Sequence, residues 1–366
     1  MENIAYVGVD YHLKTLTIAV MLEGQNQFHD VIKMDNEDKL ITKYMKKLAK
    51  DFEIKACYEA SFSGYSFKRK MDAWGYHCDV IAPSLIPKKK GDHRKNDKRD
   101  AMELAKLYAG GLLTIVHAPT GYEESVRNLI RCRLSFKDSE KRTKNQINSL
   151  LLAQGISWVN NNKWNNKHRN WLGKVQMPEK YLQVTLEEYL GHLSYLESRI
   201  KALDDQIEEI AKTDIYAPSV IKLRAFRGIG TLTAMLLIAE ITDFRRFPDA
   251  KALMAFLGLI PSEKTSGEKH RGGAITKAGN SRIRKCLVEA VQHCSKVPRM
   301  SQQMMENLRL IDPHSANIAV NCMKRLHKRY WHLILKGKIR SVALTATARE
   351  FAGFIWAMMQ PEPATV

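Results

Sequence analysis

The sequence lacks the features of a membrane or secreted protein. No apolar run reaches the roughly 18 residues that a membrane-spanning helix needs, and the first residues do not form a secretory signal. The six cysteines include no Cys-x-x-Cys pair and no disulfide-like pattern, so we expect neither a zinc site nor a disulfide framework. These absences predict a protein of a reducing cytoplasm, in which the cysteines are small buried side chains.

Acidic residues are scarce relative to basic ones. The chain of 366 residues has 58 Lys and Arg against 39 Asp and Glu, which gives a formal net charge of +19. This excess favours a polyanionic partner, because cations that neutralise phosphates release counterions. A membrane surface is the alternative, but the sequence has no evident amphipathic anchor or lipidation signal. With 45% hydrophobic residues, the chain is long enough for two or three globular domains.

The first part of the chain alternates short β-rich runs with amphipathic segments. Residues 4–11 and 15–21 suit a hairpin, because apolar and polar side chains alternate with the period of a strand. The order β-β-β-α-β-α-β-α is that of the ribonuclease-H-like fold, although fold alone does not fix function. The remaining elements are expected near 28–32 (strand), 36–50 (helix), 54–59 (strand), 64–74 (helix), 76–81 (strand) and 97–108 (helix).

Four carboxylates occupy the ends of these predicted elements. Asp10 closes the first strand and Glu59 closes the run 54–59, while Asp97 and Asp100 lie three residues apart at the start of a predicted helix. A lone Asp in a strand is weak evidence, but four acids at one edge of a sheet would repel one another unless cations neutralise them. The pattern therefore predicts a site for a hard divalent metal, Mg²⁺.

A dense run of cations precedes the last two acids. Such a run is usually a solvated surface, but its position beside the predicted metal site also fits a phosphate backbone that is led to a catalytic centre. The residues predicted to contact nucleic acid here are Lys88, Lys89, Lys90 and Arg94.

The middle of the chain is predicted to be helical, over 120–153 and 178–212. The second segment carries a heptad pattern over more than three repeats, which favours either an antiparallel helical hairpin or a helix pair used for dimerisation. The stretch 155–175 between them is rich in Trp and Asn, and its tryptophans are expected either to pack on the helices or to stack on nucleic acid. The heptad positions are Leu186, Leu193, Ile200 and Ile207, with Tyr189, Leu196, Leu203 and Ile210.

From Ile215 the pattern indicates a compact helical domain. A Gly-x-Gly turn at 228–230 precedes the apolar helix 231–241, and such a turn can present backbone N–H groups to a DNA phosphate. Residues 258–280 read as a Gly-rich basic loop that runs into the helix 281–293. The tail, 314–358, is expected to be helical and basic.

Taken in order, these segments resemble the DEDD-plus-serine transposases of insertion sequences. This family contains the Piv site-specific invertase, and its better-known members are bridge-RNA-guided recombinases. Each motif is weak alone, but their joint order is specific. They are Asp10, Glu59-Ala60-Ser61, Asn96-Asp97-Lys98-Arg99-Asp100-Ala101, Arg227-Gly228-Ile229-Gly230, Phe256-Leu257-Gly258-Leu259-Ile260-Pro261, Thr265-Ser266-Gly267 and Ile275-Thr276-Lys277-Ala278-Gly279-Asn280.

The resemblance implies a fold that is α/β in its N-terminal part and all-α beyond it. A RuvC-like domain is expected over 1–115, a long helical hairpin or coiled coil over 116–213, and a helical transposase domain over 214–366. The implied partners are donor and target DNA, a non-coding bridge RNA, and further copies of the chain in a dimer to tetramer. The implied location is the nucleoid-associated cytoplasm of a bacterial or archaeal cell.

The resemblance also implies roles for individual residues. Asp10, Glu59, Asp97 and Asp100 would hold Mg²⁺, and Ser266 would be the nucleophile of a covalent phosphoserine intermediate. Ser262 and Ser281 are nearby rivals, and Ser281 also suits a helix N-cap. The predicted phosphate clamps are Arg271, Lys277 and Arg282.

Two other functions fit the same residues. The first is a metal-dependent nuclease or junction resolvase that uses only the four acids, with water as the nucleophile. The second is a non-catalytic nucleic-acid-binding protein with a degenerate nuclease fold, which the four intact acids disfavour.

Overall fold

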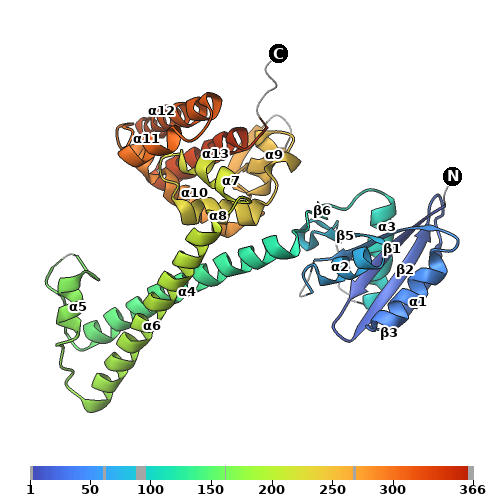
Figure 1. Ribbon diagram of the computed structural model, residues 1–366, viewed down its shortest axis with the longest axis horizontal. Coiled ribbons are helices and arrows are strands. Elements are labelled where there is room, and N and C mark those ends of the chain that lie inside the picture. Colours follow the sequence, from blue (N-terminus) through green and yellow to red (C-terminus); the bar gives the residue numbers. More distant parts are fainter. Residues whose placement is uncertain (1–2, 61–62, 88–95, 161, 267–268, 362–366) are drawn as a thin grey trace. The chain divides into compact units, whose positions relative to one another are not determined.

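The computed structural model describes residues 3–60, 63–87, 96–160, 162–266 and 269–361, and only the backbone over 263–266 and 269–272. It divides into two compact units, Met1–Thr120 and Gly121–Val366, each described here by itself (Figure 1). No helix among the described residues is both long and apolar enough to cross a bilayer.

The first unit is built on a mixed six-stranded sheet in the order β3-β2-β1-β4-β5-β6. β1 and β2, like β2 and β3, pair antiparallel, whereas β1, β4 and β5 run parallel and β6 pairs antiparallel to β5. This arrangement agrees with the ribonuclease-H-like order expected from the sequence. The strands are β1 Ile4–Tyr11, β2 Thr15–Leu22, β3 Phe28–Asp35, β4 Glu53–Glu59, β5 His77–Ile81 and β6 Ile115–Val116.

Helices cover both faces of this sheet. The side chains of Val7 and Val9 in β1 pack in one buried cluster with α1 (Asp38–Leu48) and α2 (Ser66–Ala73). α3 (Asp97–Ala109) lies on the opposite face, where Ala101 and Ala105 pack on β2. Since side chains alternate along a strand, Gly8 and Asp10 face α3. A short 3₁₀ helix, η1 (Pro83–Leu85), follows β5.

Gly8 determines how closely α3 approaches the sheet. A Cβ atom at this position would lie 2.3 Å from the Ala101 carbonyl oxygen and 2.4 Å from the Ala105 nitrogen, far inside normal contact distance. Glycine is therefore needed here for close approach of two backbones rather than for an unusual φ. This contact fixes the height of α3 above β1.

The second unit begins with two long helices, α4 (Gly121–Ala153) and α6 (Lys180–Ile210), which pack against each other. The heptad residues are used within one chain, so the hairpin prediction is confirmed. For six of the eight heptad positions the side chains are already covered within one chain, which favours the hairpin over a seam between protomers. The buried positions are Leu186, Leu193, Leu196, Ile200, Leu203 and Ile207.

The Trp-rich stretch between these helices contains α5 (Asn166–Leu172) and folds on itself. The ring of His168 is buried, and the rings of Trp158, Trp164 and Trp171 lie 5.1–5.4 Å from it. Trp164 and Trp171 also pack on the cluster that contains Leu186. Of the two interpretations of this stretch, the structure favours packing on the helices.

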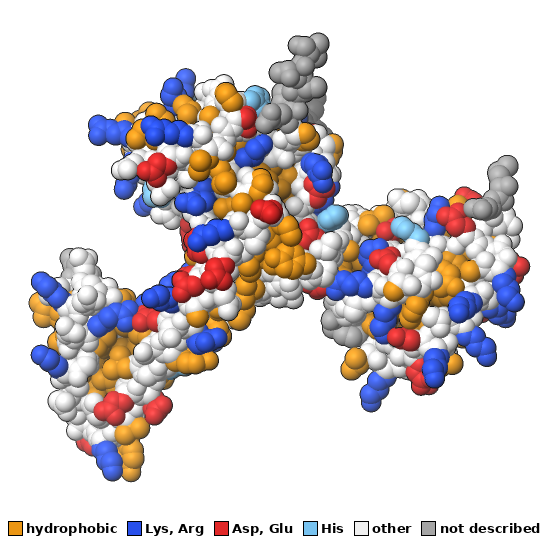
Figure 2. All heavy atoms as spheres, in the orientation of Figure 1, with side chains coloured by type: hydrophobic (Ala, Val, Ile, Leu, Met, Phe, Trp, Pro, Cys, Tyr) orange, Lys and Arg blue, Asp and Glu red, His pale blue; other side chains and the backbone are white. Residues whose placement is uncertain are grey.

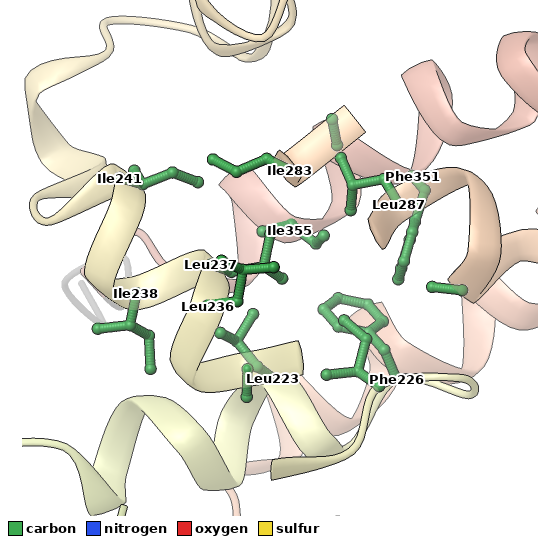
Figure 3. Packing of buried hydrophobic residues seen from close by; sticks show 14 of the residues in the cluster. Leu223, Phe226, Leu236, Leu237, Ile238, Ile241, Ile283, Leu287, Phe351 and Ile355 are labelled. Atoms are coloured by element: carbon green, nitrogen blue, oxygen red, sulfur yellow. The ribbon is translucent and has the colours of Figure 1, made fainter. Parts of the chain in front are cut away.

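The rest of the second unit is a helical bundle around a continuous apolar core. α8 (Thr231–Ile241) is buried on almost all sides, as its largely apolar sequence requires. Figure 3 shows Leu237 of α8 in the same cluster as Phe226 and Ile355 from other segments. The other elements are α7 Ala217–Arg224, η2 Phe244–Arg246, α9 Ala250–Phe256, α10 Ser281–Ala290, η3 Val291–Ser295, α11 Gln302–Leu308, α12 Pro313–Leu335 and α13 Arg340–Met358.

The region 258–280 is not a simple loop, which corrects the sequence-based expectation. It forms a β-hairpin of β7 (Pro261–Ser266) and β8 (Lys269–Ile275). At its base two glycines lie in tight contact with opposing backbone: a Cβ on Gly258 would lie 2.4 Å from the Ala278 oxygen, and one on Gly279 would lie 2.1 Å from the Phe256 oxygen. The hairpin therefore rises from a closely packed base.

Candidate active site

Two of the predicted acids meet where β1 ends. Asp10 near the end of β1, His12 in the turn after it and Asp97 in the first turn of α3 place one ligand atom each within 4.8 Å of one another. The His12 Nε2 lies 3.2 Å from Asp10 Oδ2 and 3.8 Å from Asp97 Oδ1. Within the part of the chain that the structure describes, this is the single group of three such residues.

Local structure explains how α3 presents its acids. The Asn96 side chain caps the helix by accepting a hydrogen bond from the Lys98 backbone N–H, so the first turn begins directly at Asp97. Asp97 and Asp100 then lie in the first turn, where the helix macrodipole favours negative charge. Because α3 is seated on β1 through Gly8, this turn is held beside Asp10.

The two central acids have opposite pKa shifts. Burial raises the pKa of Asp10, and the charges of Asp97 and Asp100 raise it further, although His12 partly offsets this. The pKa of Asp97 is lowered, chiefly because the Lys33 ammonium group of β3 donates a hydrogen bond to its Oδ2 at 2.9 Å. Two side chains of the protein therefore interact with these acids: Lys33 with Asp97, and His12 with Asp10.

The other two predicted acids lie less centrally. Asp100 is close enough for its charge to act on Asp10. Glu59 is the last residue of β4, and the pairing of Val9 with Tyr58 places Glu59 beside Asp10 at the same edge of the sheet. Its side chain is exposed, and it is not part of the three-residue group.

The donor set fits a divalent cation. Carboxylate oxygens are the ligands that Mg²⁺ and Ca²⁺ prefer, and a half-buried acid beside two others favours a positive partner. The imidazole of His12 would additionally suit a transition metal. Sequence reasoning missed His12 because a single histidine in a turn gives no periodic or spacing signal.

The predicted nucleic-acid contacts are only partly described. Lys88, Lys89, Lys90 and Arg94 lie outside the described residues, as do the side chains of Ser266 and Arg271. The backbone of Ser266 ends β7 and pairs with Lys269. The exposed side chains of Lys277 and Arg282 come from the base of the hairpin and from the start of α10.

A buried polar network, absent from the sequence prediction, supports this hairpin base. Glu240 of α8 has a nearly inaccessible carboxylate, which accepts two hydrogen bonds from the Arg131 guanidinium at 2.7 and 2.8 Å. Asn280 donates to the same carboxylate at 2.7 Å and caps α10 by accepting from the Arg282 N–H. Burial alone would raise the pKa of Glu240, but Arg131 more than offsets this, and the pKa is lowered.

The sequence feature that could have predicted this network is Glu240, an acid inside an otherwise apolar helix. A carboxylate in such a position is stable only when it is paired and hydrogen-bonded. Through Asn280, the network joins α4 and α8 to the segment that enters α10. It therefore fixes one end of the β7–β8 hairpin.

Two family models match this chain in different parts. The model DEDD_Tnp_IS110, described as "Transposase", matches residues 7–154, and the model "Transposase IS116/IS110/IS902 family" matches residues 222–306. The first match contains Asp10, Glu59, Asp97 and Asp100, and the second contains the β7–β8 hairpin and the Glu240 network except Arg131.

Full-length relatives agree with these matches. The chain is 33% identical to a putative transposase, y4qE, of Sinorhizobium fredii, over 97% of this chain and 88% of the relative. It is 30% identical to the transposase for insertion sequence element IS1533 of Leptospira borgpetersenii, over 92% of this chain and 99% of the relative. It is also 22% identical to the transposase for IS1328 of Yersinia enterocolitica. The chain belongs to the IS110/IS116/IS902 family of insertion-sequence transposases.

Proposed function

We propose that this transposase exchanges DNA strands through a covalent serine intermediate, with divalent metal held by the acid cluster. The metal-binding residues would be Asp10, Asp97 and Asp100, with Glu59 at the same sheet edge, and the metal would be Mg²⁺. The observation that carries the proposal is the convergence of Asp10, His12 and Asp97 from separate elements within 4.8 Å. A bound metal would polarise the phosphate and stabilise the leaving oxygen.

Ser266 is proposed as the nucleophile. Its hydroxyl oxygen forms a bond to phosphorus as the bond from phosphorus to the 3′-oxygen breaks, which leaves a 5′-phosphoserine and a free 3′-hydroxyl. The serine proton passes to a base, and the leaving oxygen takes up a proton, so the step is balanced and reversible without an external energy source. Ser266 is the last residue of β7, and the β7–β8 hairpin is proposed to present it to a DNA backbone.

The cations near these groups are proposed to hold the DNA backbone. Lys277 and Arg282 follow the hairpin directly, and both are exposed. Arg271, Lys88, Lys89, Lys90 and Arg94 are proposed for the same role from the sequence. A non-coding guide RNA and assembly into a dimer to tetramer belong to this proposal, since exchange at four strand ends needs four nucleophiles.

The alternative is a nuclease or junction resolvase in which water attacks the phosphodiester. The same acids serve this function equally well, because a metal cluster can activate water as readily as a hydroxyl. The two functions differ in whether the broken strand remains joined to the protein.

Trapping the intermediate tests the proposal. The full chain is incubated with end-labelled DNA from the termini of its insertion sequence and Mg²⁺, then denatured, and labelled protein is separated from free DNA. A protein–DNA adduct that protease removes is expected for wild type, and no adduct is expected for Ser266→Ala. Free cut ends that persist in Ser266→Ala would instead establish the water mechanism.

Ser262→Ala is the matched control. The Ser262 hydroxyl donates a hydrogen bond to the Ala274 carbonyl at 3.0 Å, so this serine has a structural partner across the hairpin. We expect the adduct to persist in Ser262→Ala. An adduct that maps by peptide sequencing to Ser262, Ser281 or a tyrosine would refute the assignment of Ser266.

A further inference from the structure

A second candidate binding site lies on the first unit, away from the acid cluster. A groove of about 780 Å³ runs between the edge strand β3 and helix α1. Five lysines and several apolar side chains line it together, and none of the lining residues is acidic. We call it the lysine groove, and its lining consists of Ile32, Met34, Lys39, Leu40, Thr42, Lys43, Tyr44, Lys46, Lys47 and Lys50. We call the apolar part of the lining, Ile32, Met34 and Leu40, its floor.

The lysines of this groove form a stripe in helical phase. Four of them, Lys39, Lys43, Lys46 and Lys47, lie in α1 at i, i+4, i+7 and i+8, which places them on one side of the helix, and Lys50 follows two residues after its end. All five are exposed, and none of their ammonium groups has an ion pair with a described residue. In Figure 2, Lys and Arg side chains gather over the region that Figure 1 labels α1.

Other lysines of the same unit form ion pairs with acidic residues. Lys68 pairs with Asp72 at 3.1 Å, and Lys70 pairs with Asp38 at 2.7 Å. Like charges at i, i+4 destabilise a helix, so an unneutralised stripe disfavours α1 in the free protein. An anionic ligand with regularly spaced charges would remove this repulsion.

The floor of the groove restricts the ligand further. Leu40 is 41% exposed, and Ile32 and Met34 are only partly buried, so apolar surface is available between the lysines. The paired bases of a duplex cannot reach such a floor, whereas unpaired bases can pack on it while the backbone follows the cations. A single strand therefore fits both the lysines and the floor.

The choice between DNA and RNA follows from the family of the chain. The two hydroxyl groups of the lining are already engaged: the Thr42 hydroxyl is bonded to the Asp38 carbonyl at 2.7 Å, and the Tyr44 hydroxyl donates to Asp30 at 2.9 Å. Since the chain belongs to a family of transposases, the strand expected here is DNA. We propose that the lysine groove binds single-stranded DNA, such as a strand segment unpaired during exchange.

The length of the stripe sets the size of the ligand. From Lys39 to Lys47, the lysines inside α1, the helix rises about 12 Å at 1.5 Å per residue. At a stacked spacing of about 3.4 Å per nucleotide, this length spans about four phosphates. The inference goes beyond the proposed chemistry, because binding here requires neither metal nor Ser266.

Binding measurements in EDTA test the groove without cleavage. The full chain is titrated with a labelled 20-nucleotide single strand, with the matching duplex and with the RNA of the same sequence, at several salt concentrations. For the triple variant Lys43→Gln, Lys46→Gln and Lys47→Gln, we expect the slope of log K against log salt to become shallower by about two for the single strand. Affinity should fall up to about 100-fold at 0.1 M salt. Gln keeps the helix propensity of Lys, so α1 should remain folded.

A charge-matched control removes three lysines elsewhere. Lys180, Lys201 and Lys212 are exposed and have no ion pair among the described residues, so their triple Gln variant loses the same charge. Equal effects of the two triple variants would overturn the proposal, as would equal weakening of duplex binding. Tighter, lysine-dependent binding of the RNA would overturn the choice of DNA.

A floor variant separates the two parts of the groove. Leu40→Gln should weaken single-strand binding while the salt slope stays the same, because no charge is removed. Retention of wild-type affinity in Leu40→Gln would show that the floor plays no part and would refute the single-strand assignment. Failure of the covalent trapping experiment would leave these results unaffected, so the two proposals fail separately.

Discussion

Replacement of Gly8 by alanine is expected to disrupt the proposed metal site through a displacement of α3. The new Cβ would lie 2.3 Å from the Ala101 oxygen, and normal contact requires about 3.4 Å, so the helix must retreat by about 1 Å. Overpacking of this kind costs about 1–3 kcal/mol of stability. It also moves Asp97 and Asp100 by more than the roughly 0.5 Å that a ligand set tolerates.

The control for this experiment lies on the neighbouring residue. Val7 is fully buried on the opposite face of β1, against α1 and α2. Val7→Ala should lower the free energy of unfolding by about 2 kcal/mol through lost burial and a small cavity, while α3 stays in place. The two variants therefore lose similar stability but differ in the position of the acids.

Two measurements distinguish these outcomes. Thermal unfolding in EDTA gives the stability loss, and calorimetric titration with Mg²⁺ or Mn²⁺ gives the metal affinity. Gly8→Ala should lose metal binding and at least about 100-fold in cleavage rate, whereas Val7→Ala should keep both below its melting temperature. Wild-type metal affinity in Gly8→Ala would refute the argument that this contact positions the site.

Three further outcomes are expected. Asp10→Asn should abolish cleavage and, in EDTA at neutral pH, raise the melting temperature. The pKa of Asp10 in the folded state is raised above 3.8, so ionisation of this group destabilises the fold as the pH rises through that range, and the neutral amide avoids this cost. Glu240→Gln should cost about 1–3 kcal/mol by leaving Arg131 without its carboxylate. Because the pKa of Glu240 is lowered below 4.5, the wild-type protein should lose the stability that this pair contributes as the pH falls below about 4.5. In urea titrations at several pH values, the free energy of unfolding of the variant should therefore fall less steeply at acid pH than that of wild type. Leu196→Asp with Leu203→Asp should unfold the α4–α6 hairpin, seen as lost helical circular dichroism, rather than only dissociate an oligomer.

The sheet was predictable because its signals are local. Alternating apolar residues identify β1 and β2, and acids at the ends of β1 and β4 indicated which edge of the sheet carries the site. The short strand β6 was not predicted, since two residues are too few to show a period. The β7–β8 hairpin was missed for a related reason: its sequence is charged and Gly-rich, so it lacks the apolar alternation of a packed strand.

Local sequence patterns do not say which segment a buried face packs against. The heptads of α6 predicted a helical seam correctly, but a 3.5-residue period is the same whether α4 or a second chain fills it. The tryptophans of the connector posed the same problem. Their partner, the buried ring of His168, became evident only when α5 was placed beside them.

The acid cluster illustrates how burial and charge together point to chemistry. The carboxylates of Asp97 and Asp100 act on that of Asp10, and the chain provides one lysine, Lys33, and one histidine, His12, beside them. Lys33 serves Asp97, whose pKa is lowered, whereas burial and repulsion leave the pKa of Asp10 raised. The three carboxylates exceed the single charge of Lys33 by two negative charges, which one divalent cation would balance. A purely structural role would be met at lower cost by an amide or an apolar side chain at position 10. The retained charge therefore makes sense as a ligand set rather than as part of the scaffold.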